Sequence, residues 1–340
     1  VTANKALIAV HGNEIFRAAH EKGVIVAFEA AVAGGIPVIK SLREGLGANR
    51  IEWVAGIING TGNFILTHMR DEGRAFEDVL AEAQALGYAE ADPTFDVEGI
   101  DAAHKLTILA SIAYGVPLQF EKAFTEGISR ITAEDVEQAD NLGYVIKHLG
   151  ISKRTDQGLE LRVHPTLIPK ERLLANVHGV KNAIAVMGDA VGPTLYYGAG
   201  AGAEPTASAV VADLLDVARD IATDHHYRVP YLAFSGIDED VSQLPIMPME
   251  EITTAYYLRL LAVDRPGVLA RVATILAEQG ISIEALIQKE ATEGELVPII
   301  LLTHRTKEKQ MNEAIREIEA MADIAGPVTR IRVESLDEGE

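Results

Sequence analysis

The sequence predicts a multidomain protein that combines α/β and α+β architecture, and three observations support that prediction. Its 340 residues are too many for one compact core, so two or three domains are expected. Aromatic residues are few, at 5%, whereas alanine, glycine and branched aliphatic residues abound, which suits α/β layers better than an all-β sandwich. Short apolar runs alternate with helical patterns along most of the chain, which indicates mixed α and β elements.

The charge and the cysteine content exclude several functions. A formal net charge of −20 argues against a general nucleic-acid or anionic-membrane binder, although local basic groups can still line a pocket for an anionic substrate. The absence of cysteine excludes disulfides, thiolate metal sites and a cysteine nucleophile. No apolar run is long enough to span a bilayer and no signal peptide is visible, so the cytoplasm is the expected location.

Residues 1–29 indicate the edge of a Rossmann-type nucleotide-binding domain. A strand end is followed by a helix from about Gly12 to Lys22, and the apolar run at 24–28 is typical of a parallel strand buried on both faces. Since the chain opens without methionine inside a strand pattern, we expect the natural N-terminus and the earlier strands of this domain to be missing from this sequence.

Residues 30–235 predict an α+β unit. Its expected elements, in order, are a glycine-containing turn at 29–37 followed by a helix, a strand at 51–58, a tight turn at 59–63, helices at 64–71, 75–86 and 99–114, a helix from Thr132 to about Leu149, strands near 159–165 and 183–188, and a helix at 205–223. Thr132 and Asp135 resemble a capping box, and Pro205 suits a first helical turn. The helix at 205–223 is expected to pack back on the nucleotide-binding remnant.

Beyond a polar, proline-bearing linker at 236–253 the pattern starts again. Strands are expected at 254–263, 281–289, 296–303 and 327–334, with helices at 267–279 and 307–321. This order is a complete βαββαβ unit, which predicts a ferredoxin-like fold for residues 254–334.

Asp101 and Lys105 are the most informative charged pair, because they lie four residues apart on an otherwise apolar helix and so share one face. Burial lowers the pKa of a lysine and nearby carboxylates raise it, so a lysine balanced in this way can exchange protons near neutral pH. Spacing alone favours a simpler interpretation, an ordinary surface salt bridge that contributes about 0.3–0.5 kcal/mol. The acidic loop before the helix is equally consistent with a polar surface.

Four segments in the same order resemble homoserine dehydrogenases. They are Val-Thr-Ala-Asn-Lys-Ala-Leu at 1–7, Phe-Glu-Ala-Ala-Val-Ala-Gly-Gly-Ile-Pro at 28–37, Gly-Ile-Ile-Asn-Gly-Thr-Gly-Asn-Phe at 56–64, and Gly-Tyr-Ala-Glu-Ala-Asp-Pro at 87–93 with Gly-Ile-Asp-Ala-Ala-His-Lys-Leu at 99–106. The resemblance covers nearly the whole chain. It implies an NAD(P)-dependent oxidoreductase that interconverts L-homoserine and L-aspartate 4-semialdehyde, in the biosynthesis of threonine, methionine and isoleucine. Residues 30–235 would then be its catalytic and dimerisation domain.

The resemblance implies a role for each of several residues in substrate binding and catalysis. Lys105 would be the catalytic lysine, taking the hydroxyl proton in the oxidative direction and donating it in the reductive one. Glu90 and Asp101 would hold the amino group and the hydroxyl end of homoserine, since carboxylates suit a cationic ammonium. The segment 59–63, with Gly60 and Thr61 as substrate contacts, would line the substrate pocket. Many family members carry Thr or Ser where this chain has Gly62, so backbone donors are expected there.

Cofactor contacts, either to NADP or to NAD, are implied for Lys5, Gly87 and Gly202. The glycine run at 198–202 lacks the spacing of a dinucleotide fingerprint, which is expected to precede residue 1. We therefore expect this 340-residue chain by itself to show little dehydrogenase activity. A site for a monovalent cation, sodium or potassium, is implied for the Glu29 carboxylate with the backbone carbonyls of three further residues. These are Val32, Gly34 and Ile36.

Residues 254–334 resemble an ACT domain, a small-molecule sensor of amino-acid pathways. The strand-to-helix turn where such domains bind effectors would be formed by Asp264, Gly267, Val268 and Leu269. The helix N-terminus at this turn offers N–H donors to the carboxylate of an amino acid. The resemblance implies that this amino acid is L-threonine, acting as a feedback inhibitor. A domain used only for oligomerisation is the alternative, and a homodimer or homotetramer is expected in either case.

Two other functions remain open on the sequence alone. The first is a non-catalytic amino-acid sensor derived from such an enzyme, against which the presence of Lys105, Asp101 and Glu90 argues. The second is an enzyme in which Lys105 forms a Schiff base with the semialdehyde, which borohydride trapping would reveal.

Overall fold

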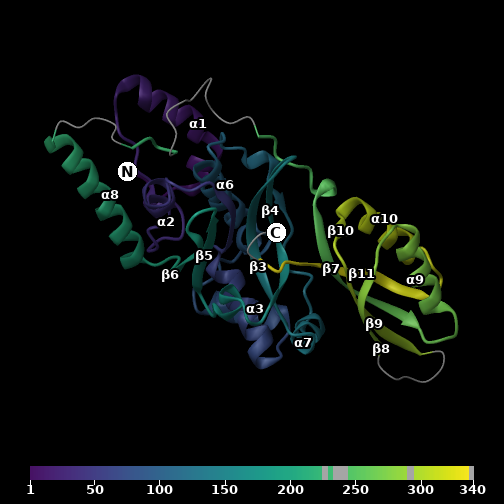
Figure 1. Cartoon of the computed structure of the whole chain (residues 1–340). Helices are drawn as coiled ribbons and strands as arrows, with labels where there is room; N and C mark the ends of the chain where they lie inside the picture. The colour runs from purple at the N-terminus through teal and green to yellow at the C-terminus, as the bar shows by residue number, and fades with distance from the viewer. Residues whose placement is uncertain (224–228, 233–243, 289–294, 337–340) are drawn as a thin grey trace.

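The structure is a computed structural model that describes residues 1–223, 229–232, 244–288 and 295–336. Within these residues eleven strands form one sheet, which runs through the middle of the molecule and on into the C-terminal unit (Figure 1). Along its main path the strands are β6 (Gly192–Ala199), β5 (Lys181–Gly188), β1 (Ile51–Ile57), β3 (Tyr144–Thr155), β4 (Gly158–Pro169), β11 (Ile324–Val333), β7 (Thr253–Val263), β9 (Leu296–Thr303) and β8 (Ile283–Gln288). The short strands β2 (Phe124–Thr125) and β10 (Thr306–Lys307) pair with β4 and β7.

The helices pack mainly around the central strands. They are α1 (Lys5–Lys22), α2 (Val38–Lys40), α3 (Gly60–Glu72), α4 (Phe76–Ala85), α5 (Thr94–Val97), α6 (Ile100–Tyr114), α7 (Ala133–Asn141), α8 (Ala203–Thr223), α9 (Val268–Glu278) and α10 (Glu308–Glu319). The most deeply buried is α6, which lies between α1 and the strands β1, β3 and β4. In Figure 1, α8 and the C-terminal unit lie at opposite ends of the molecule. None of the helices in the described part of the chain is long and apolar enough to cross a membrane.

The N-terminal segment differs from the sequence prediction. The helix begins at Lys5 instead of Gly12, because the Asn4 side chain accepts a hydrogen bond from the N–H of Leu7 at 3.0 Å and caps the helix there. The strand predicted at 24–28 is wrong. In the described structure that segment has no neighbouring strand, and its one backbone bond to the first residues joins Thr2 N to Ala27 O at 2.9 Å. The assignment of residues 1–29 to a nucleotide-binding domain therefore stays a prediction.

Two predicted boundaries in the middle of the chain are also wrong. The predicted turn at 59–63 is the first turn of α3, because the side chain of Asn59 accepts the N–H of Gly62 at 2.8 Å. The capping box of Thr132 and Asp135 is confirmed, but the helix ends at Asn141 rather than near Leu149. Gly143, with φ of +86°, terminates it and β3 follows. Strands β3 and β6 were not predicted from the sequence, and β4 was predicted too short.

The βαββαβ prediction for the C-terminal unit is confirmed. Its strands follow the antiparallel order β11-β7-β9-β8, with α9 and α10 packed on the sheet. Of the predicted linker at 236–253, residues up to 243 lie outside the described residues. Residues 245–247 run beside β4, where Ile246 bridges to Leu159, and a 3-10 helix at Met249–Glu251 then leads into β7. The C-terminal unit is also joined to the middle of the molecule, because β11 pairs in parallel with β4 at Arg332 and Val333.

Candidate active site

The pair formed by Asp101 and Lys105 on α6 is buried, so it is not the solvated surface bridge that spacing alone favoured. Lys105 Nζ lies 2.6 Å from Asp101 Oδ2 and donates to the backbone oxygen of Ile58 at 2.8 Å. The two side chains are 12% and 5% exposed. The Ile58 carbonyl follows β1, so the end of a central strand and a central helix together fix the lysine ammonium.

A second lysine contacts the same carboxylate. Lys5 Nζ lies 3.1 Å from Asp101 Oδ1, and about a third of the Lys5 side chain remains exposed. Burial opposes ionisation of Asp101, but the charges of Lys105 and Lys5 hold the pKa of this carboxyl below its ordinary value. The structure therefore brings together three predicted residues, although Lys5 lies at the start of a helix and not at a strand end.

Asn59 completes the polar network, although the sequence marked it only as the start of a segment. Its Nδ2 donates to Asp101 Oδ2 at 3.0 Å and to Asp96 Oδ1 at 2.8 Å, while its Oδ1 caps α3. Burial raises the pKa of Asp96. The usable signal was an asparagine directly before a glycine-rich helix start, because that residue type is a preferred N-cap.

Gly60 and Thr61 lie in the first turn of α3, next to Asn59. The Thr61 hydroxyl donates to the backbone oxygen of Tyr88 at 2.6 Å, which ties this turn to the loop after α4. A Cβ at Gly60 would lie 2.8 Å from the oxygen of Val180, so no larger residue fits there without a shift. Both residues thus border the network formed by Asn59 and Asp101.

The structure does not bring Glu90, Gly87 or Gly202 into this network. Glu90 is exposed, and no described hydrogen bond or ion pair joins its carboxylate to Asp101 or Lys105. Gly87 has φ of +76° and its N–H closes α4 on the oxygen of Gln84 at 3.1 Å. Gly202 has φ of +120° and directly precedes α8. Local backbone conformation explains these two glycines.

Glu29 lies in the turn for which a cation site was predicted. Its carboxylate is buried and accepts the N–H groups of Ile39 at 3.0 Å and Lys40 at 2.9 Å, so it caps α2. Burial raises the pKa of Glu29 to about 7. The carbonyl of Ile36 already accepts the N–H of Val38 at 2.7 Å. Among the described residues no group of three or more His, Asp or Glu side chains could hold a metal ion, so any cation here would depend on backbone oxygens.

His104 lies beside the site and was not singled out from the sequence. Its ring stacks on Phe120 with 4.1 Å between ring centroids and lies 5.5 Å from the ring of Phe95. Burial lowers the pKa of this imidazole, and its Nδ1 has no hydrogen-bond partner among the described residues. Because Lys5 Nζ lies 5.9 Å from the centroid of Phe95, these aromatic rings form one apolar wall next to the lysine–carboxylate network.

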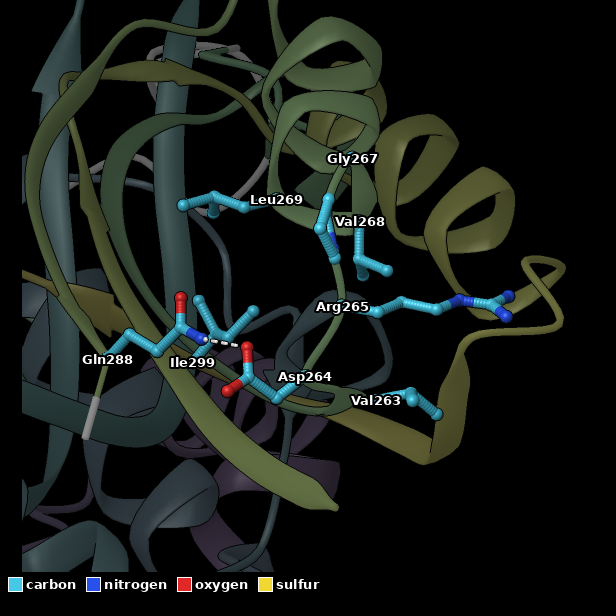
Figure 2. A pocket seen from close by; sticks show the side chains of 9 residues that line it. Val263, Asp264, Arg265, Gly267, Val268, Leu269, Gln288 and Ile299 are labelled. Carbon is cyan, nitrogen blue, oxygen red and sulfur yellow. Dashed lines mark hydrogen bonds between the residues drawn. The ribbon is translucent and has the colours of Figure 1, made fainter. Parts of the chain in front are cut away.

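The C-terminal unit has a pocket of its own, of about 340 Å³, where the sequence predicted an effector site (Figure 2). Its lining includes all four predicted residues, Asp264, Gly267, Val268 and Leu269. Gln288 Nε2 donates to Asp264 Oδ1 at 3.1 Å across the pocket. Gly267, with φ of +93°, directly precedes α9, so the first N–H groups of that helix lie at the pocket.

A buried lysine and carboxylate in an α+β unit, joined to a ferredoxin-like unit with a separate pocket, are typical of a regulated enzyme that acts on small molecules. Comparison with known proteins agrees. A homoserine dehydrogenase family model matches residues 37–215, and an ACT domain model matches residues 256–323. The chain belongs to the homoserine dehydrogenase family and ends in an ACT domain.

Individual relatives show how far the similarity extends. A homoserine dehydrogenase of Pseudomonas aeruginosa is 70% identical over 99% of this chain and 77% of its own length. The crystal structure of a homoserine dehydrogenase from Thiobacillus denitrificans is 67% identical, with a TM-score of 0.94 over 99% of this chain and 76% of its own. A hyperthermophilic archaeal homoserine dehydrogenase in complex with NADPH is 30% identical, with a TM-score of 0.56 over 64% of this chain and 63% of its own.

Proposed function

We propose that this enzyme interconverts L-homoserine and L-aspartate 4-semialdehyde and that Lys105 is its proton-transfer group. The supporting observation is the position of Lys105 Nζ, held in a buried site by Asp101 Oδ2 at 2.6 Å and the oxygen of Ile58 at 2.8 Å. An ammonium fixed in this way can donate a proton to a carbonyl oxygen in a defined direction. The non-catalytic sensor loses support, since the chain belongs to an enzyme family and keeps this site.

The proposed chemistry transfers one proton and one hydride. In the reductive direction the Lys105 ammonium donates its proton to the aldehyde oxygen of the semialdehyde, and the carbonyl carbon receives the hydride. In the oxidative direction the neutral Lys105 amine takes the hydroxyl proton as the C–H bond gives up its hydride. A bound nicotinamide nucleotide supplies or accepts that hydride. Asp101, an anion between two lysines, orients Lys105 and faces the polar end of the substrate.

We propose Lys5, Gly87 and Gly202 as contacts to that nucleotide, with NADP favoured because one relative is in complex with NADPH. The fit rests mainly on Lys5, the more exposed of the two lysines at Asp101, which leaves its ammonium open to an anionic or polar group of the nucleotide. We propose Glu90 as a substrate contact that forms only when substrate is bound, because its carboxylate is now exposed. Gly60 and Thr61 would line the pocket from the start of α3.

The reaction is tested directly by following formation of the reduced nucleotide when the purified full-length enzyme, rather than residues 1–340 by themselves, is mixed with L-homoserine and NADP⁺ or NAD⁺. We expect turnover that depends on L-homoserine, with L-aspartate 4-semialdehyde as the product. Turnover of other hydroxy amino acids at equal rates would contradict the proposed substrate. The ratio of kcat/KM for the two nucleotides decides the cofactor preference.

We propose that a monovalent cation binds at Glu29 with the carbonyls of Val32, Gly34 and Ile36. Burial raises the pKa of the Glu29 carboxyl from its ordinary 4.5 to about 7, and the charge of nearby Asp213, whose Oδ2 accepts the Glu29 N–H at 2.9 Å, adds to this rise. Because the folded-state pKa is raised, the stability that this carboxyl contributes is full below pH 4.5 and is lost as pH rises through about 7. A bound cation would offset that loss.

Sodium or potassium chloride is therefore expected to raise Tm at pH 8, relative to tetramethylammonium chloride at equal ionic strength. A shift of about 2–4 °C corresponds to ~1 kcal/mol of binding. The difference should shrink toward pH 5, and Glu29→Gln should abolish it at every pH. An equal Tm in all three salts at pH 8 contradicts the cation site.

We propose L-threonine as the effector of the ACT domain. Asp264 can accept hydrogen bonds from the α-ammonium of an amino acid, while the N–H groups at the start of α9 can donate to its carboxylate. Calorimetry is expected to show L-threonine binding that Asp264→Asn weakens by about 10- to 100-fold, the range for a lost hydrogen bond to a charged group. L-Valine, which has the same shape without the hydroxyl, serves as the control ligand. A domain used only for oligomerisation would bind neither.

We further propose the domain assignment 1–29, 30–235 and 254–334 for nucleotide-binding remnant, catalytic unit and regulatory unit, and a homodimer or homotetramer that works in the cytoplasm. The acidic, cysteine-free composition supports the location. Light scattering of the purified protein and fractionation of its source cells test the assembly and the location, respectively.

A further inference from the structure

One short segment touches both the C-terminal unit and the start of the catalytic helix. Residues 126–129, here called the bridging segment, lie between β2 and α7. On one side the Glu126 carboxylate forms ion pairs with β11: its Oε2 lies 3.1 Å from Arg332 Nη1 and 3.4 Å from Arg330 Nη2. The bridging segment is thereby attached to the last strand of the ACT domain.

On its other side the bridging segment holds two of the three residues that directly precede α6, Val97 and Glu98. The N–H of Ile128 donates to the oxygen of Val97 at 2.9 Å, and the Ser129 hydroxyl donates to Glu98 Oε1 at 2.7 Å. The third residue, Gly99, has no room for a side chain, because a Cβ there would lie 3.0 Å from Val163 and 3.2 Å from the ring of His148. That ring is in turn fixed by the bridging segment.

His148 depends on the bridging segment for its orientation. It is buried, and burial lowers its pKa to about 4, so the ring is neutral at physiological pH. Its Nε2 lies 3.0 Å from the backbone oxygen of Glu126, and since a carbonyl can only accept, Nε2 carries the proton. Within the described part of the chain its Nδ1 has no hydrogen-bond partner. Among these residues the bond to the Glu126 carbonyl is therefore the polar contact that orients the ring, which lies where a Gly99 side chain would be.

The far anchor of this arrangement, Arg332, is held by several contacts. The Arg332 side chain is fully buried and is also bound to Glu308, with Nε and Nη2 at 2.9 Å and 2.5 Å from its carboxylate oxygens. Its guanidinium lies 5.1 Å from the ring centroid of Phe124 in β2. A planar guanidinium held from both sides fixes the position of the Glu126 carboxylate.

We infer that Glu126 is a positioning residue for the reaction. By tying the bridging segment to β11, it fixes the start of α6 and therefore the places of Asp101 and Lys105. This inference rests on the proposed role of Lys105. Proton transfer needs the lysine in a narrow range of positions, and displacement by about 1 Å can cost as much as ~100-fold in rate. A fast chemical step therefore requires that the contacts between the ACT domain and the catalytic unit are intact.

The test compares two ion pairs that cross the same junction. Glu126→Gln keeps the shape of the side chain and removes the negative charge that pairs with Arg332 and Arg330. Because the Glu126 side chain is 30% exposed, we expect the variant to fold. Arg259→Gln removes the other ion pair, in which Arg259 Nε lies 2.6 Å from Asp135 Oδ1 at the start of α7, outside the bridging segment. Tm, kcat and the KM for L-homoserine are measured for both variants.

Glu126→Gln is expected to lower kcat on the order of 10-fold with a smaller change in KM, whereas Arg259→Gln lowers Tm but keeps kcat within about twofold. Glu126→Asp, which keeps the charge, should give an intermediate kcat. Equal losses of kcat in Glu126→Gln and Arg259→Gln would mean general loosening of the junction and overturn the inference. So would an unchanged kcat in Glu126→Gln. An active Lys105→Met variant, by contrast, would overturn the proposed function itself.

Discussion

Replacement of Lys105 by methionine is expected to lower kcat for L-homoserine oxidation by about 10²- to 10⁴-fold, the contribution of a positioned proton-transfer group. Methionine retains the length and the apolar stem of lysine, so α6 keeps its packing against β1 and β3. The change removes the hydrogen bonds to Asp101 and to the oxygen of Ile58. Steady-state kinetics under saturating L-homoserine and cofactor measure the loss.

Lys105→Arg separates proton transfer from charge. Arginine supplies the cation that Asp101 needs but cannot be deprotonated in proteins, so it cannot act as a base. We expect its kcat to be as low as that of Lys105→Met, with Tm closer to that of the unmodified enzyme. Recovery of most of the activity by arginine would show that Lys105 acts only through its charge.

The Schiff-base alternative, in which Lys105 bonds covalently to the substrate, is tested by borohydride trapping. Borohydride added to enzyme and L-aspartate 4-semialdehyde would then leave a reduced adduct on Lys105, visible as a mass increase of the peptide that contains it. Direct hydride transfer predicts no such adduct. It also predicts that hydride from the reduced nucleotide appears on the carbinol carbon of L-homoserine, which isotope labelling detects.

The C-terminal unit could be predicted from the sequence, whereas part of the central sheet could not. Residues 254–334 alternate apolar strands with helical patterns and glycine turns, so each element carries its own local signal. By contrast, β3 carries Lys147 and His148 in its middle, both buried. Lys147 donates to Asn63 Oδ1 at 3.1 Å and to the oxygen of Val177 at 2.5 Å, contacts that make its burial possible. Because these partners are distant in sequence, the alternation of polar and apolar residues along β3 does not reveal that its polar residues are buried.

The site shows the same limit. The pair of Asp101 and Lys105 was visible because four residues on a helix share one face. The contact between Lys5 and Asp101 joins residues far apart in sequence, so only a family resemblance suggested that both belong to one site. Asn59 was expected only as part of a pocket-lining segment; its bond to Asp101 was missed because it follows from where α3 begins, and that boundary was misplaced.

The other large effect is expected for stability, at the junction between β4 and the end of β11. Arg162 is almost fully buried and lies between two carboxylates, with Nη2 at 2.7 Å from Glu160 and 2.6 Å from Glu334. Its Nη1 also lies 2.7 Å from His164 Nε2. Burial opposes the charge on Arg162, but Glu334 and Glu160 raise its pKa, so the guanidinium remains a cation between them.

Arg162→Leu is therefore expected to lower the free energy of unfolding by about 3–5 kcal/mol, because it leaves two buried carboxylates without their cation. Urea denaturation at pH 7.5 measures the change. Arg219→Leu, the same substitution in a pair with Asp216 where the arginine is 72% exposed, is the matched control and should cost at most about 1 kcal/mol. In Arg162→Leu the cost comes from the unpaired charge of the two buried carboxylates, so the deficit should shrink as pH falls and protons neutralise that charge. A cost as small as that of the control, or one that does not change with pH, would mean that this buried network contributes packing rather than charge compensation.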